Sequence, residues 1–205
     1  MKNNLLIALL FSSICAKAQD ASDFPVRKWS LDFGGSVGVF IPFDQVKDSK
    51  TAIGSNAITT LQLNYREHFF TRLQFGQTTV DFKYRSTFPT INSDISAKAN
   101  STNLGLVFGY QRSFRRLQPY VFAGAGASFI DAPTAFYDPE QNMVNYRTLS
   151  GTHLQVIAGA GLNYRLSKTF ILFLEGQAAT IPDIPKNSAT HLSGISALIG
   201  IKAPL

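Results

Sequence analysis

Apolar and polar residues alternate along most of the chain with a period of two, the pattern of β-strands that have one apolar face. The clearest example covers residues 154–179. Up to residue 165, even positions are mainly apolar and odd positions are polar or glycine, with Ile157 as the exception. After a polar turn at Ser167 and Lys168 the alternation resumes. This stretch predicts an antiparallel hairpin.

The same alternation recurs along the chain and predicts about eight strands. Short turns and long connections join them in strict succession. The long connections are expected at residues 42–56, before residue 101, at 131–150 and at 181–189. Strands of about ten residues with this layout are typical of outer-membrane barrels. The predicted fold class is all-β, an eight-stranded antiparallel transmembrane β-barrel with short periplasmic turns and long extracellular loops.

In one predicted strand, the apolar residues move from one parity to the other. Beyond Thr78, the apolar residues Val80, Phe82 and Tyr84 take the parity that Arg72 holds earlier in the strand. A β-bulge or the end of the buried segment is expected at this point.

A soluble eight-stranded barrel would also alternate, with its apolar face turned inward around a ligand. The polar face argues for a membrane instead, because it is rich in Gly, Ser, Asn and Gln and has few charges. Aromatic residues also gather near both strand ends, as they do at membrane interfaces. Those expected beside the short turns are Trp29, Tyr65, Phe69, Phe70, Tyr110, Phe114, Tyr120, Tyr164 and Phe170, and those near the long loops are Phe40, Phe43, Phe82, Tyr84, Phe129, Phe136 and Tyr137.

The N-terminus has the features of an export signal: Lys2, an apolar run at residues 5–11, and the small-residue site Ala16-Lys17-Ala18. The apolar run is shorter than the roughly 20 residues that a membrane-spanning helix needs. Cys15 follows Ile14, where lipid attachment requires a small residue. The expected organisation is a cleaved signal peptide at residues 1–18, a short segment at 19–28 and the barrel at 29–205.

The formal net charge is +6, and subtraction of Lys2 and Lys17 with the signal leaves +4. A soluble protein this basic would suggest a nucleic-acid partner, but here the cations gather at the short turns and no nucleic acid is expected. This basic rim would attract anionic phospholipid headgroups. Alternatively, its charges are merely solvated and keep the turns from aggregating. The rim comprises Arg112, Arg115, Arg116 and Lys168.

The lumen of an eight-stranded barrel is largely filled by its own side chains. Inward glycines would make room for long residues such as Arg72, Arg165, Gln111 and Gln155, so a plugged lumen is predicted. Charges there must pair or face water. The expected network is either a structural plug or the gate of a narrow pore, with Glu175 near mid-barrel. Its members are Asp32, Arg66, Arg72, Arg165, Glu175 and Lys202.

Catalysis has weak support. The sequence His191-Leu192-Ser193 resembles the His-x-Ser of lipid A deacylases, but no acidic residue follows Ser193 as in that family. A serine without an oriented base is a poor nucleophile. His68 and His153 have no metal-ligand spacing with each other. No catalytic residue, metal or cofactor is therefore predicted, and a lipid-modifying enzyme is kept as an alternative.

Several segments carry a family resemblance: residues 119–126 (PYVFAGAG), 158–162 (AGAGL), 174–176 (LEG) and 200–202 (GIK). With the export signal, they resemble the outer-membrane β-barrel domain family, often called the porin family and abundant in Bacteroidota, and more distantly the OmpA and OmpX transmembrane domains. The resemblance covers nearly all of the mature chain and implies the outer membrane of a Gram-negative bacterium. One departure is the last residue, Leu205, where outer-membrane strands usually end on an aromatic residue.

The expected role is structural or one of surface interaction, carried by the long loops of a monomer. Outer-membrane lipid is the expected surrounding partner, and proteins or other surface ligands would contact the loops. The competing classes are a lipid-modifying enzyme and a secretion or adhesion component that binds partner proteins.

Overall fold

The computed structural model describes residues 28–43, 49–66, 68–88, 91–138, 143–182 and 192–205. The predicted signal peptide lies outside these residues. Within them, no helix is long and apolar enough to cross a membrane. The strands are β1 (Trp29–Pro42), β2 (Ser49–Thr51), β3 (Gly54–Tyr65), β4 (Phe69–Phe88), β5 (Ile91–Gln111), β6 (Leu117–Asp138), β7 (Met143–Arg165), β8 (Ile171–Thr180) and β9 (Gly194–Pro204).

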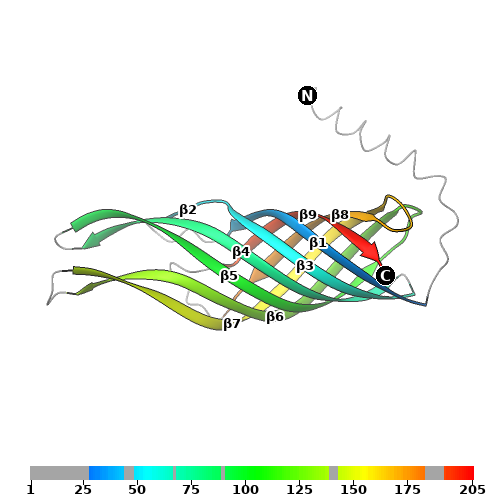
Figure 1. Ribbon diagram of the computed structural model, residues 1–205, viewed down its shortest axis with the longest axis horizontal. Coiled ribbons are helices and arrows are strands. Elements are labelled where there is room, and N and C mark those ends of the chain that lie inside the picture. The colour runs from blue at the N-terminus through cyan, green and yellow to red at the C-terminus, as the bar shows by residue number, and fades with distance from the viewer. Residues whose placement is uncertain (1–27, 44–48, 67, 89–90, 139–142, 183–191) are drawn as a thin grey trace, which may run out of the picture.

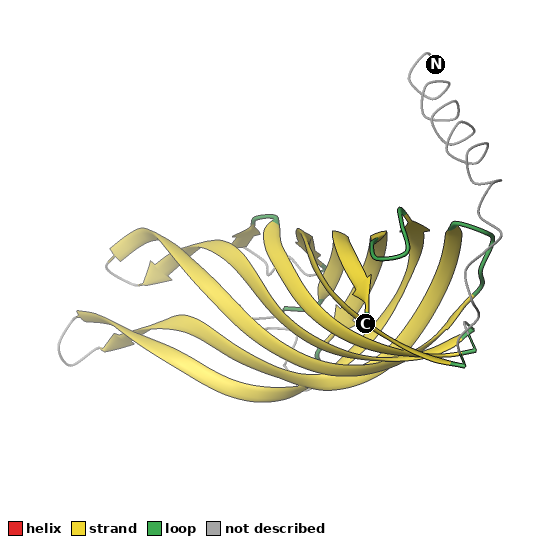
Figure 2. Cartoon of the chain, turned by 45° about the vertical axis from the view of Figure 1, so that its right-hand side comes forward, coloured by secondary structure: helices red, strands yellow, loops and turns green. Residues whose placement is uncertain are grey.

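The strands form one closed antiparallel sheet in the order β2-β4-β3-β1-β9-β8-β7-β6-β5, and the β4–β5 pairing closes the ring. The short strand β2 pairs with β4 beyond the point where β3 stops, so it occupies the same position around the barrel as β3. Eight strand positions therefore surround the lumen (Figures 1 and 2). The predicted eight-stranded barrel is confirmed.

Where the structure describes the side chains of the long strands, the exposed apolar residues lie on the outside of the barrel. In the β7–β8 hairpin, Val156 and Leu174 are exposed, whereas Gln155, Asn163 and Glu175 are buried. The predicted hairpin is present, with Leu162 opposite Leu174. An apolar exterior around a polar interior is the arrangement that hydrocarbon surroundings require of a closed sheet.

Aromatic side chains mark both ends of this apolar exterior. Trp29, Phe69 and Phe170 are exposed near the short turns, and Phe43 and Phe129 are exposed near the other end.

The predicted position in these aromatic belts is wrong for three residues. Phe40, Phe70 and Tyr120 are buried inside the barrel, because their parity on the strand places them on the lumen side. The side chains of Phe82, Tyr84, Phe136 and Tyr137 lie outside what the structure describes.

Several inward glycines face aromatic rings. Phe70 lies directly opposite Gly109, and Phe122 directly opposite Gly159, in neighbouring strands. The pairs Tyr120–Gly161 and Phe173–Gly200 repeat the arrangement. A Cβ on any of these glycines would overlap the facing ring, so the glycines give the rings a place to lie flat against the wall. The prediction that inward glycines accommodate long polar chains missed this use.

The phase change at Val80 is not a bulge. Strands β4 and β5 pair residue for residue from Phe69 opposite Tyr110 to Phe88 opposite Ile91. Val80 instead points into the lumen and is fully buried. It belongs to an apolar cap, the cluster Phe40, Val80, Ala99, Ile130, Ile181 and Leu192. The phase change therefore marks the level at which the interior turns from polar to apolar.

Two of the predicted long loops are strands. The hairpins β4–β5 and β6–β7 continue well past the other strands (Figure 1). The pairing between β5 and β6 ends at Asn100 opposite Asp131, and above it the hairpins form two separate arms. Exterior residues at this level, such as Asp81 and Asn100, are polar. Outside hydrocarbon neither face has to be apolar, which removes the period that identifies a strand in sequence.

Candidate functional site

An ion pair crosses the lumen. The Arg72 Nη1 atom lies 2.6 Å from the Glu175 Oε2 atom, and both side chains are almost completely buried. Arg72 is on β4 and Glu175 on β8, and three strands separate them in either direction around the sheet. The pair therefore spans the barrel from one wall to the opposite one. The Tyr120 hydroxyl, from β6, donates a second hydrogen bond of 2.6 Å to the same carboxylate oxygen.

Aromatic rings surround the two buried cations. The Arg72 guanidinium carbon lies 5.1 Å from the ring centroids of Phe70 and Phe122 and 5.2 Å from that of Tyr120. The Lys202 Nζ atom lies 4.9 Å from the Tyr120 centroid and 4.5 Å from that of Phe173. Cation–π contacts contribute about 2 kcal/mol or more each when they are desolvated. They compensate for the Arg72 Nη2 atom, which has no hydrogen-bond partner.

Gln62 connects the two cations. Its Oε1 atom accepts hydrogen bonds from Arg72 Nε at 3.0 Å and from Lys202 Nζ at 3.2 Å. Lys202 also donates to Asn163 Oδ1 at 3.2 Å. One amide oxygen thus serves both cations.

The network continues toward the short turns through Asn64. Its Oδ1 atom accepts from Gln62 at 2.6 Å and from Gln111 at 3.3 Å, and its Nδ2 atom donates to Asp32 Oδ2 at 2.8 Å. Hydrogen bonds therefore link mid-barrel to Asp32 without a break.

The formal charges of this group cancel. Arg72 and Lys202 contribute two positive charges, and Glu175 and Asp32 contribute two negative ones, 2 − 2 = 0. A buried charge is very costly when it is unbalanced. The balance explains how four ionisable groups fit inside so narrow a barrel.

The structure brings together four of the six residues predicted for the lumen network: Asp32, Arg72, Glu175 and Lys202. Arg165 is half-buried beside the short turns. With the Gln118 amide oxygen facing the donors around it, Arg165 Nη2 and Nε donate to that oxygen at 2.8 and 3.3 Å.

Arg66 does not join the network, so its predicted place in the lumen is corrected. Strand β3 ends at Tyr65, and Arg66 occupies the following turn with a left-handed φ of 49°. It is exposed, and its guanidinium carbon lies 5.2 Å from the Tyr65 ring centroid.

The predicted basic rim lies in two short turns. Arg115 and Arg116 form the β5–β6 turn, with Phe114 and Leu117 paired on either side, and Arg115 has a left-handed φ of 56°. Arg112 is exposed, as is Lys168 in the β7–β8 turn. The Arg165 amide donates to the Arg116 carbonyl at 2.8 Å, which ties the β5–β6 turn to the end of β7.

The residues suggested by the resemblance to lipid A deacylases do not form a catalytic group. Ser193 is 2% exposed. Its Oγ atom accepts from the Ile181 amide at 3.0 Å and donates to Thr180 Oγ1 at 3.3 Å. His191 lies outside the described residues. Among those the structure does describe, no three His, Cys, Asp or Glu residues are placed to hold a metal ion.

Sequence reasoning missed the residues that hold the ion pair in place: Tyr120, Gln62, Asn64 and the rings of Phe70, Phe122 and Phe173. Parity along the strand was the available signal. Gln62 and Asn64 share parity with other inward positions of β3, and Tyr120 and Phe122 share parity with Gln118. The position of an aromatic residue near a turn instead predicts that it lies at the membrane interface.

Residues 6–192 match the model of the outer membrane protein beta-barrel domain. The chain belongs to this family. Its location is accordingly the outer membrane of a Gram-negative bacterium. No curated protein sequence matches the chain.

Solved structures share the fold at low sequence identity. OprG from Pseudomonas aeruginosa matches with a TM-score of 0.58 and 11% identity, over 87% of this chain and 96% of OprG. Neisserial surface protein A matches with a TM-score of 0.54 and 9% identity, over 86% and 97% of the two chains. A major outer membrane protein from Thermus thermophilus matches with a TM-score of 0.56 and 12% identity, over 87% and 100%. These likenesses establish the barrel fold.

The ion pair generates a prediction about stability. Glu175→Gln and Arg72→Met each leave one charge buried without its partner, a loss of about 3–5 kcal/mol. The double variant is expected to lose less than the sum of the two, because it buries neither charge. Urea unfolding in detergent micelles, analysed as a double-mutant cycle, measures this coupling.

The exposed pair Asp81 and Lys98, with 3.9 Å between Oδ1 and Nζ, provides the control. Asp81→Asn and Lys98→Met should couple by no more than about 1 kcal/mol. If the buried pair couples no more strongly than this surface pair, the interior pair does not hold the lumen together.

Proposed function

We propose that the protein is a closed, monomeric outer-membrane barrel with a structural and surface-interaction role, whose lumen is plugged by the ion-pair and polar network. The observation that carries the proposal is the Arg72–Glu175 pair, which bridges opposite walls inside a cage of aromatic rings. No enzymatic step is part of it, since the Ser193 hydroxyl is buried and engaged in structural hydrogen bonds.

A plug is favoured over a freely conducting pore by the number of contacts at one level of the barrel. Tyr120 and Gln62 hold the two partners from other strands, and Phe70 and Phe122 cover the guanidinium. Opening would separate a buried pair at a cost of about 3–5 kcal/mol, so the open fraction would be roughly one in a hundred to one in several thousand. A narrow, rarely open gated pore is the second candidate.

Planar bilayer recordings distinguish the plug from the gate. We expect no ion conductance from the wild-type protein, and none from Glu175→Gln, because the aromatic rings still fill the cross-section after the charge is removed. The Gln77→Glu variant, changed on the exterior of β4, serves as the control for reconstitution. Discrete openings in the wild type that become more frequent in Glu175→Gln would establish a gate and contradict the plug.

The two arms support the surface-interaction part of the role. Residues 91–99 of β5 pair only with β4, and residues 132–138 of β6 pair only with β7, among the residues that the structure describes. These facing strand edges carry unpaired N–H and C=O groups. An extended polypeptide pairs with such edges by adding a strand. The proposed ligand class is therefore an extended segment of a partner protein.

Shortening one arm tests this recognition. Asp81 and Lys98 are opposite each other, so residues 82–97 can be replaced by Asn-Gly, which closes a two-residue hairpin. Wild-type protein in micelles should bind reduced, carboxymethylated α-lactalbumin, an extended-chain probe, and the shortened variant should lose most of that binding. Native α-lactalbumin is the matched probe without extended segments. Equal binding by both variants, or equal binding of both probes, would contradict strand addition.

The basic rim is a separate part of the proposal. We propose that Arg112, Arg115, Arg116 and Lys168 bind anionic headgroups of the periplasmic leaflet. Their position in adjoining short turns supports it. Each cation near a membrane surface contributes about 1 kcal/mol.

Lipid retention tests the rim. The triple variant Arg112→Gln, Arg115→Gln and Arg116→Gln should retain fewer phosphatidylglycerol molecules than the wild type in native mass spectrometry. Retention of phosphatidylcholine, which has no net charge, should stay the same. Unchanged phosphatidylglycerol retention would mean that these charges only solvate the turns.

A further inference from the structure

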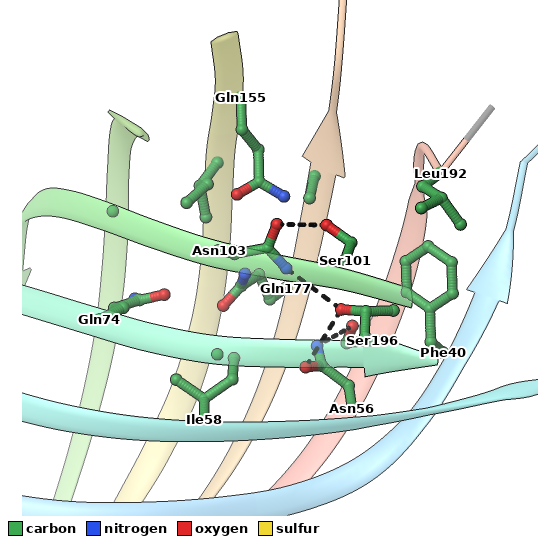
Figure 3. A pocket seen from close by; sticks show the side chains of 15 residues that line it. Phe40, Asn56, Ile58, Gln74, Ser101, Asn103, Gln155, Gln177, Leu192 and Ser196 are labelled. Atoms are coloured by element: carbon green, nitrogen blue, oxygen red, sulfur yellow. Dashed lines mark hydrogen bonds between the residues drawn. The ribbon is translucent and has the colours of Figure 1, made fainter. Parts of the chain in front are cut away.

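A small cavity lies in the lumen between the apolar cap and the ion pair. Its volume is about 20 Å³. Figure 3 shows amide and hydroxyl side chains that reach into it from several strands. The polar residues that matter here are Gln74, Gln155, Gln177, Asn56, Asn103 and Ser196.

Apolar side chains close the cavity on both sides. Phe40 and Leu192, members of the apolar cap, line one end. Ile157 lines the other end and packs in one cluster with Phe70 and Phe122, the rings that cover Arg72. Apolar side chains therefore line both ends of the cavity along the barrel.

Three buried glutamines have polar atoms without a protein partner. Gln74, Gln155 and Gln177 are 3%, 5% and 6% exposed. Gln74 Nε2, Gln155 Oε1 and Gln177 Oε1 form no hydrogen bond with the protein. Leaving such an atom unsatisfied in the interior costs about 1–3 kcal/mol.

The other polar groups of the cavity wall already have partners. Asn56 Nδ2 donates to Ser196 Oγ at 2.8 Å, and Asn103 Oδ1 accepts from Ser101 Oγ at 2.8 Å (Figure 3). Asn103 Oδ1 also accepts from Ser128 Oγ at 2.8 Å. The three glutamines therefore need a partner that the protein does not supply.

We propose that this cavity is a binding site for one ordered water molecule, which accepts a hydrogen bond from Gln74 and donates one each to Gln155 and Gln177. The donors and acceptors match, because water has two donor hydrogens and two acceptor lone pairs, and the three unpartnered glutamine atoms are two acceptors and one donor. The volume also fits, since a cavity needs about 10–15 Å³ to hold a single water molecule. A metal cation fits worse, because the Gln74 N–H group would point its positive end at the ion.

This water site is independent of the proposed role of the arms and of the rim. The water completes the hydrogen bonds of the three interior glutamines. Neither the ion pair nor the aromatic rings supply those partners.

Nuclear magnetic resonance of the ¹⁵N-labelled protein in micelles tests the site. The Gln74 side-chain amide should show a direct cross-peak to a bound water, and this cross-peak should disappear in the double variant Gln155→Leu and Gln177→Leu. Gln77, which is exposed on the exterior of the same strand, should show no bound-water signal. Absence of the wild-type Gln74 cross-peak would overturn the proposal.

Urea unfolding provides a second test of the water site, for the case that the double variant folds too poorly for magnetic resonance. Gln155→Leu and Gln177→Leu should each lower the urea midpoint, and together they should lower it by less than the sum, because they share one water. An additive effect would overturn the shared site. A midpoint that rises when choline is replaced by sodium or potassium would identify a cation and overturn the assignment to water.

Discussion

The structure depends on one constraint: inside a membrane, a backbone N–H or C=O group has no water to bond with. A sheet meets this constraint only when it closes, and here the β4–β5 pairing completes the ring. Closure then fixes the direction of every side chain, because alternate residues face lipid or lumen. The apolar face must be outside, so the polar residues become the core. The polar character of the lumen therefore follows from the closure of the backbone hydrogen bonds around the barrel.

A polar core has to satisfy itself. In this barrel the cations and carboxylates balance, and Gln62 and Asn64 connect them. Aromatic rings contribute where hydrogen bonds run out, around Arg72 and Lys202. The rings fit because glycines face them across the strand, so small residues in one strand position charged residues in another. The ion pair is thus a product of packing as much as of charge.

Much of the barrel was predictable from sequence, because lipid imposes a strict period on the exterior. The strands, their apolar faces and the inward positions of Arg72, Glu175 and Lys202 all follow from parity. The interior obeys no comparable rule. Val80, Phe70 and Tyr120 face inward although they are apolar or aromatic. Their pattern predicts a bulge or the end of the buried segment for Val80, and the membrane interface for the two aromatic residues. Arg66 shows the opposite error, since one left-handed turn residue removes it from the strand. The arms were missed because neither of their faces has to be apolar.

The interior changes from polar to apolar along the barrel axis. This change bears on whether the ion pair alone could open and close a pore. Near the short turns the core is polar and charged, and at Val80 it becomes apolar, where Phe40, Ile130 and Leu192 pack together. These two closures differ in chemistry and share no residue. Loss of a charge at Glu175 weakens the first and leaves the second unchanged, because the apolar cap contains no ionisable group. A gate based on the ion pair would therefore require a second, coupled movement of the cap, which is the physical reason to favour a plug.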